Sequence, residues 1–215
     1  MAAYASVLLV TLSMLVLVVQ TALNSTRVVR VGCVGDSITE LTDYPSYLQT
    51  LLGTSYEIGN FGVCGATVRV DSFTPYLDQG AFTRVTEFQP DVIILMLGTN
   101  DARTDNYKSI DSFVANYKNL ISKLKGLNSK PKIFLVKPPP LFPNDLELSP
   151  TDLKDGVIPK IEQVAAELDL QLIDLYSVLE NRPDCFEDGV HPNDKGATVI
   201  AETFYDFLSS RQSLT

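Results

Sequence analysis

The sequence contains a single histidine, His191, and only three cysteines, Cys33, Cys64 and Cys185, none of which forms a CxxC pair. A zinc site needs a cluster of such ligands, so this set excludes one, and we expect no bound metal and no other cofactor. An odd number of cysteines leaves at least one thiol unpaired within the chain. The sequence does not tell whether the other two are bridged.

The chain also lacks any block rich in Lys or Arg, and its formal net charge is −9. Attraction to a phosphate backbone or an anionic membrane surface would have to overcome net repulsion, which argues against nucleic acid as a partner. Hydrophobic residues make up 45% of the 215 positions, with 12 Gly and 12 Pro. This profile is typical of one globular domain, which we place at residues 27–210. No oligomer signature can be recognised.

The first 26 residues carry no charged side chain, and residues 5–19 form a nearly continuous run of Leu, Val and Ala. Such a run is typical of a secretory signal peptide or a membrane anchor, which we place at residues 1–23. Its length favours a cleaved signal, whereas the absence of Lys or Arg before it argues against one. Arg27 and Arg30 just after it also conflict with secretion. We expect a secreted or membrane-anchored protein of the secretory pathway.

Apolar runs of strand length alternate with helical patterns along the rest of the chain. The runs lie at residues 28–34, 56–58 with Phe61, 91–97, 132–136 and 170–175, and helical spacing occurs at 44–52, 81–88, 110–124, 157–168 and 194–208. Two runs are continuous rather than alternating, as in strands covered on both faces. This order predicts an α/β fold with five parallel strands in a doubly wound, three-layer α/β/α sandwich. The proline-rich loop at 138–150 is expected to form a stiff wall beside the site.

Ligands of such folds bind outside the carboxyl ends of the strands. Three polar, glycine-containing segments follow three of the predicted strands, namely Gly35-Asp36-Ser37, Asn60-Phe61-Gly62 and Gly98-Thr99-Asn100-Asp101. All of them are therefore expected at the same edge of the sheet.

Ser37 is the candidate nucleophile of this edge. Taken alone it would be interpreted as an ordinary turn residue, because Ser and Gly commonly end strands. The second glycine of a GxSxG elbow is missing, which argues against an α/β-hydrolase. A serine hydroxyl is a weak nucleophile that needs a base within hydrogen-bonding reach, and the chain offers one imidazole, His191.

His191 alone would be interpreted as an exposed residue of a Pro/Gly loop. Asp188, however, lies three residues earlier and is separated from it by Gly189. A tight loop can place the Asp188 carboxylate on one ring nitrogen while the other faces Ser37, the arrangement in which the carboxylate stabilises the imidazolium. Glu187 is the competitor for this position, and we expect it to be a solvated surface charge.

Acyl transfer also needs donors aimed at the oxyanion of the tetrahedral intermediate. The candidates are the N–H of Ser37, the N–H of Gly62, where a missing Cβ allows close approach, and the side-chain amide of Asn100. Considered singly, Gly62 fits a β-turn and Asn100 fits a cap or Asx-turn. Asp36 and Asp101 are expected to brace the loops rather than react.

Four segments resemble the ordered blocks of the SGNH, or GDSL-type, hydrolase superfamily: "GDSIT" (35–39), "NFGVCGAT" (60–67), "GTND" (98–101) and "DGVHPN" (188–193). The resemblance covers about residues 28–208, and four blocks in order are far more specific than one. It implies a flavodoxin-like sandwich with Ser37 as nucleophile, Gly62 and Asn100 in the oxyanion hole, and Asp188 and His191 completing the triad.

The segments "NFGVCGAT" (60–67), "QPDVIILMLGTNDAR" (89–103) and "LIDLYSVLENRPDCFEDGVHPN" (172–193) are similar to the branch related to sialate O-acetylesterases and microbial carbohydrate acetylesterases. This implies a serine esterase that hydrolyses esters of short acyl groups, among which O-acetyl groups of carbohydrates are candidates. Its partner would be its substrate, a small-molecule or glycan ester. Lipase, lysophospholipase and acyltransferase activities use the same constellation, and a non-catalytic glycan-binding module is the alternative from another class. Cys64 stands where many relatives have serine, and exposure near Ser37 would make the protein sensitive to thiol reagents.

Overall fold

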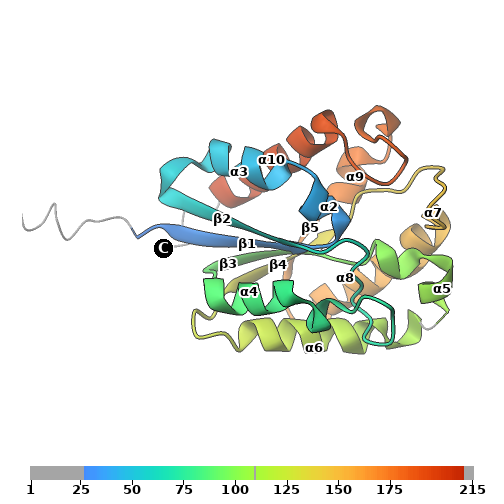
Figure 1. Cartoon of the computed structure of the whole chain (residues 1–215), viewed down its shortest axis with the longest axis horizontal. Helices are drawn as coiled ribbons and strands as arrows, with labels where there is room; N and C mark the ends of the chain where they lie inside the picture. The colour runs from blue at the N-terminus through green and yellow to red at the C-terminus, as the bar shows by residue number, and fades with distance from the viewer. Residues whose placement is uncertain (1–26, 109, 211–215) are drawn as a thin grey trace, which may run out of the picture.

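Five parallel strands form the centre of the computed structural model, which describes residues 27–108 and 110–210 (Figure 1). The strands are β1 (Val29–Gly35), β2 (Tyr56–Gly62), β3 (Val92–Met96), β4 (Lys132–Lys137) and β5 (Gln171–Asp174). Their order across the sheet is β2-β1-β3-β4-β5, the flavodoxin-like order of a doubly wound fold. The predicted fold class is therefore confirmed.

The continuous apolar strands are buried on both sides, as their sequences predicted. In β3, Ile93 and Leu95 belong to one core, whereas Ile94 and Met96 belong to the other. Because successive side chains of a strand point to opposite faces, a strand covered on both faces needs an unbroken apolar run.

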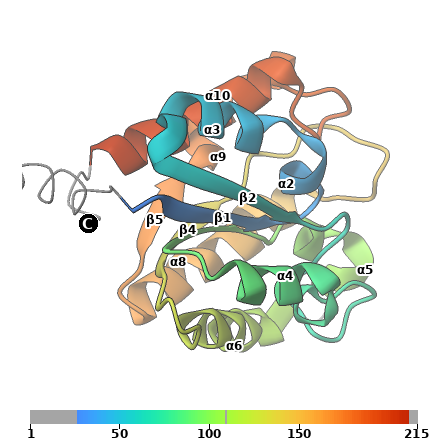
Figure 2. The same ribbon diagram turned by 60° about the vertical axis from the view of Figure 1, so that its left-hand side comes forward.

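Helices α3 (Tyr44–Leu52), α9 (Leu175–Leu179) and α10 (Asp194–Ser209) cover one face of the sheet (Figure 2). Tyr44 of α3 packs edge-on against Phe204 of α10. Helix α10 begins at Asp194, as its apolar spacing predicted, and Asn193 caps it, because the Asn193 side chain accepts the N–H groups of Lys195 and Gly196 at 3.0 and 3.2 Å.

The opposite face is covered by α4 (Gly80–Phe88), α6 (Phe113–Lys125) and α8 (Ile158–Glu167). The apolar positions that predicted α6 are all fully buried: Phe113, Tyr117, Leu120, Ile121 and Leu124. Helix α6 follows a 3₁₀ turn, η4 (Ile110–Ser112), and helix α8 follows a π-helical turn, η5 (Leu153–Val157). The predicted start of α6 was therefore a few residues too early.

Several short helical segments escaped the sequence prediction because three to five residues are too few for a 3.6-residue period to be recognised. They are α2 (Ser37–Leu41), α5 (Thr104–Tyr107), α7 (Pro150–Asp152), η1 (Gly53–Ser55), η2 (Tyr76–Asp78), η3 (Asn100–Ala102) and η6 (Pro183–Cys185). Two of them, α2 and η3, carry candidate site residues.

The strand register brings the candidate segments to one edge. Gly35 pairs with Gly62 on one side and with Met96 on the other, so the chain leaves β1, β2 and β3 at the same level. Because β2 and β3 flank β1, the chain turns in opposite directions after β1 and β3, which is where doubly wound folds bind ligands.

Among residues 27–108 and 110–210, no helix combines the length and the apolar character needed to cross a membrane. The segment interpreted as a signal peptide or anchor, residues 1–23, lies outside the described residues.

Candidate active site

Ser37 is the first residue of helix α2 rather than a residue of an open turn, which corrects the expectation from sequence. Asp36 caps this helix, because its Oδ1 accepts the Ile38 N–H at 3.0 Å. The Ser37 side chain is buried, and its own N–H belongs to the first helical turn, where backbone donors have no partner within the helix. Among the described residues this N–H donates to no other group, so it is available to a ligand.

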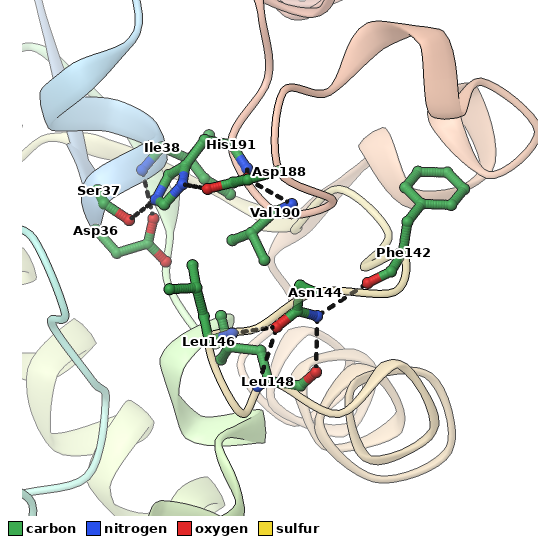
Figure 3. A network of polar contacts seen from close by, with 10 residues as sticks. All are labelled: Asp36, Ser37, Ile38, Phe142, Asn144, Leu146, Leu148, Asp188, Val190 and His191. Carbon is green, nitrogen blue, oxygen red and sulfur yellow. Dashed lines mark hydrogen bonds and ion pairs between the residues drawn. The ribbon is translucent and has the colours of Figure 1, made fainter.

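Ser37, His191 and Asp188 form one hydrogen-bonded chain, as predicted (Figure 3). The Nε2 atom of His191 lies 3.0 Å from Ser37 Oγ, and its Nδ1 lies 2.7 Å from Asp188 Oδ2. An ionised carboxylate only accepts hydrogen bonds, so Nδ1 carries the proton and Nε2 offers its lone pair to the serine hydroxyl. This is the tautomer that a general base needs.

Asp188 is held ionised by its own loop. Its second oxygen, Oδ1, accepts the N–H groups of Val190 at 3.0 Å and His191 at 2.8 Å. Desolvation raises the pKa of Asp188, but the hydrogen bonds from His191 and Val190 outweigh it and hold the pKa below its ordinary value. A carboxylate that stays charged at neutral pH can stabilise an imidazolium beside it.

Glu187, the competing carboxylate, is exposed, and the carboxylate that pairs with the imidazole is that of Asp188. Only its backbone takes part, by donating to the His191 carbonyl at 3.0 Å. The structure therefore agrees with the choice of Asp188 made from the loop spacing.

Asn100 begins the 3₁₀ turn η3 directly after β3. Its side-chain Nδ2 donates to the Ala66 carbonyl at 3.1 Å, and its backbone carbonyl accepts a hydrogen bond from Asn106 Nδ2 at 2.8 Å. A primary amide has two N–H donors, so one remains for an incoming oxyanion. The geometry fits the donor role expected of Asn100.

Gly62 does not fit the donor role expected of it. It is the last residue of β2, and its N–H already donates to Asn60 Oδ1 at 3.0 Å. A Cβ at this position would lie 2.2 Å from the Glu40 nitrogen and 2.8 Å from the Asp36 carbonyl oxygen. The missing side chain therefore allows α2 to pack on β2, and the glycine acts through packing.

Gly65, which the sequence interpretation passed over, is the better placed glycine. It lies between Cys64, whose thiol interacts with the Ser37 hydroxyl, and Ala66, whose carbonyl holds Asn100. Its φ is +74°, as glycine allows in a tight turn, and its N–H donates to no other group among the described residues. The sequence feature that could have identified Gly65 is its place as the second glycine of the "NFGVCGAT" segment.

Asp36 and Asp101 brace the loops, as expected, and both are fully buried. Asp101 accepts the N–H groups of Val68 at 3.0 Å and Arg69 at 3.2 Å, which ties the segment after β2 to the segment after β3. Desolvation raises the pKa of Asp36 to about 6, although the Ile38 N–H opposes the change, and it raises the pKa of Asp101 to about 7 against the N–H groups of Val68 and Arg69.

Cys64 is exposed at the rim of the site, whereas Cys33 and Cys185 are buried, and all three thiols are free. Desolvation and the nearby carboxylates of Glu40 and Asp36 raise the pKa of the Cys64 thiol. Within residues 27–108 and 110–210, no group of three or more His, Cys, Asp and Glu side chains is placed to hold a metal ion.

A pocket of about 230 Å³ opens beside His191 and Asp188. Mostly polar residues line it together with the triad members His191 and Asp188: Leu41, Thr42, Asp43, Glu187, Pro192, Asn193, Asp194 and Ala197. A general acid delivers its proton to the leaving group, so in an acyl transfer this side would receive the alcohol part of the substrate.

Comparison with known proteins places these residues in a family context. Residues 33–199 match the model of the GDSL-like Lipase/Acylhydrolase family. The chain is 33% identical over 200 residues to an acetylxylan esterase of Xylanibacter ruminicola, covering 81% of this chain and 42% of that protein. The chain spans about half the length of the named relatives it matches.

Solved structures share the fold. A carbohydrate acetylesterase family member from Sinorhizobium meliloti superposes with a TM-score of 0.69 at 23% identity, covering 86% of this chain and 99% of that one. An acetyl xylan esterase, AlAXEase, gives a TM-score of 0.65 at 23% identity, covering 84% and 100%.

Proposed function

Since the chain belongs to the GDSL-like Lipase/Acylhydrolase family, we propose that it is a serine esterase that removes short acyl groups, acetyl above all, from carbohydrates. The observation that carries this proposal is the chain of hydrogen bonds from Asp188 through His191 to Ser37. The name of the acetylxylan esterase relative supports the choice of acyl group and alcohol.

The reaction starts at Ser37. His191 Nε2 takes the hydroxyl proton while Oγ attacks the ester carbonyl, and the Asp188 carboxylate stabilises the imidazolium that forms. The oxyanion accepts hydrogen bonds from the Ser37 N–H, the Gly65 N–H and the Asn100 amide. His191 then protonates the leaving alcohol, and water repeats the sequence on the acyl-enzyme.

The pocket beside His191 supports a hydroxyl-rich alcohol. Thr42, Asn193 and the carboxylates of Asp43 and Asp194 line it, and such groups can hydrogen-bond to sugar hydroxyls. A lipid-like alcohol would take water from the carboxylates of Asp43 and Asp194 without offering hydrogen bonds in return, which costs free energy.

The test combines one nucleophile variant with two chain lengths. We expect wild-type protein to hydrolyse p-nitrophenyl acetate faster than the octanoate and to release acetate from acetylated xylo-oligosaccharides. Ser37→Ala should abolish turnover and covalent labelling by a fluorophosphonate while its circular dichroism spectrum stays unchanged. A preference for octanoate would contradict the short-acyl assignment and favour a lipase. Undiminished turnover by the variant would exclude Ser37 as nucleophile, and a folded wild type that neither turns over nor labels would favour a glycan-binding module.

We also propose that residues 1–23 direct the chain into the secretory pathway, as a cleaved signal or as a membrane tether. The uncharged first 26 residues and the apolar run at 5–19 support this. Expression of the full chain, followed by fractionation and N-terminal sequencing, separates the outcomes. Protein that retains residues 1–23 and is found in the cytosol would contradict the proposal.

A further inference from the structure

The loop between β4 and α7, residues 138–149, runs along the site without regular secondary structure. Figure 3 shows part of it, with the Asn144 side chain among the backbone groups of Phe142, Leu146 and Leu148, close to the triad. Backbone polar groups of an irregular segment must find partners elsewhere, so the contacts of this loop decide its shape.

Asn144 supplies most of those partners inside the loop. Its Nδ2 donates to the carbonyls of Phe142 at 2.9 Å and Leu148 at 3.0 Å. Its Oδ1 accepts the N–H groups of Leu146 at 3.0 Å and, more weakly, Leu148 at 3.4 Å. The two donors and two acceptor positions of one amide are thus all used to close the segment 142–148 on itself.

One end of this segment rests on the loop that carries the triad pair. The Phe142 N–H donates to the Gly189 carbonyl at 2.8 Å, and the Phe142 ring packs against Phe186 with centroids 5.0 Å apart. Gly189 has φ of +83°, and a Cβ there would lie 2.4 Å from the Pro143 carbonyl oxygen. The two loops therefore touch backbone to backbone between Asp188 and His191.

The other end is attached to the oxyanion side. The Ser149 N–H donates to the Ala102 carbonyl at 3.1 Å, and the Thr104 N–H donates to the Glu147 carbonyl at 3.2 Å. Ala102 closes the 3₁₀ turn that Asn100 begins. Residues 142–149 thus form a strap from the loop of Asp188 and His191 to the loop of Asn100.

We propose that Asn144 is a positioning residue, which fixes the length of this strap and thereby the placement of His191 and Asp188 relative to Ser37 and Asn100. The proposal rests on the proposed esterase function for its kinetic consequence. The placement of His191 can be tested without any activity, because His191 is the only histidine in the chain and NMR can observe its ring without overlap from another histidine.

Gln49 provides a matched control at the opposite edge of the sheet. Its side-chain amide also ties a loop by backbone hydrogen bonds, to the carbonyls of Gly53 and Tyr56 at 3.0 Å each and to the Ile58 N–H at 2.9 Å. Loss of either amide removes a comparable set of hydrogen bonds, but only Asn144 is connected to the site.

The experiment compares wild type, Asn144→Ala and Gln49→Ala in thermal unfolding, hydrolysis of p-nitrophenyl acetate, fluorophosphonate labelling and NMR of the His191 ring. We expect both variants to lose thermal stability. Asn144→Ala alone should lower kcat and the labelling rate by about tenfold, with KM within about twofold, because small misplacements of reacting groups are costly in rate. It alone should also shift or broaden the Nδ1–H resonance of His191.

Asn144→Asp serves if Asn144→Ala does not fold, because it keeps the acceptors for Leu146 and Leu148, while it loses the two donated bonds and places a charged oxygen against the carbonyls of Phe142 and Leu148. An Asn144 variant that loses stability like Gln49→Ala, with unchanged kcat and an unchanged His191 resonance, would overturn the proposal. A wild type without turnover or labelling would refute the esterase function, while the His191 resonance would still decide the positioning role.

Discussion

His191 Nε2 lies 3.0 Å from Ser37 Oγ, although 154 residues separate them along the chain. The sheet causes this contact, because β1 ends next to β3 and the loop before α10 returns to the same edge. Each partner is held on its own side, Ser37 by the capped start of α2 and His191 by the carboxylate of Asp188. The geometry is thus set before any substrate arrives.

Replacing Asp188 should affect the chemical step rather than substrate binding. In Asp188→Asn the amide cannot stabilise the imidazolium and no longer favours the proton on Nδ1, so we expect kcat to fall by about 10⁴-fold with KM nearly unchanged. Glu187→Gln, one residue away, should stay within about twofold of wild type. An equal loss in both variants would mean that the loop, and not the carboxylate, matters.

Removing the Asn100 amide should cost transition-state stabilisation. One oxyanion donor contributes about 3 kcal/mol, so Asn100→Ala is expected to lower kcat by about 10²-fold or more, with a small change in KM. Steady-state kinetics on p-nitrophenyl acetate measure this. A rise in KM without loss of kcat would place Asn100 in substrate binding instead.

The two glycines after Asn60 should respond differently to alanine. A Cβ at Gly62 would lie 2.2 Å from the Glu40 nitrogen, so Gly62→Ala should displace α2 and abolish most activity, although the backbone N–H remains. Gly65 has room, its nearest neighbour being Thr74 Oγ1 at 3.8 Å, so Gly65→Ala should fold with a loss of about 1 kcal/mol from its positive φ. Urea denaturation and kinetics distinguish them, and a harmless Gly62→Ala would contradict the packing role.

Cys64 should be the thiol that reacts first, since Cys33 and Cys185 are buried. Its raised pKa predicts slow alkylation by iodoacetamide at pH 7 and faster alkylation at pH 9, because the thiolate is the nucleophile. The adduct beside Ser37 should block hydrolysis. Cys64→Ser should remain active and become resistant, and equal inactivation of this variant would point to another target.

Asp101 should make the fold less stable as the pH rises. Burial raises its pKa to about 7, so the folded state binds this proton more tightly than the unfolded state, and stability falls between about pH 4 and pH 7. The difference is of the order of 1.4 kcal/mol for each unit of pKa shift. Urea denaturation should find wild type more stable at pH 5 than at pH 7.5, with a smaller difference in Asp101→Asn. Rising stability over this range would contradict the direction.

The sequence by itself determined the order of the five strands, because apolar runs of strand length alternate with helical patterns along the chain, and two of those runs are continuous, as in strands covered on both faces. It also determined the pairing of Asp188 with His191, since both lie in one short loop, and it limited the base to the only imidazole in the chain. These are local patterns or matters of elimination, which need no coordinates.

Tertiary structure alone decided what each glycine does. "NFGVCGAT" contains both Gly62 and Gly65, and only the approach of α2 to β2 shows that the first is needed for packing and leaves the second with a free N–H. The strap that Asn144 closes is also tied by contacts between distant segments, from Phe142 to Gly189 and from Ser149 to Ala102. Such contacts depend on how elements pack, so they leave no periodic pattern in the sequence.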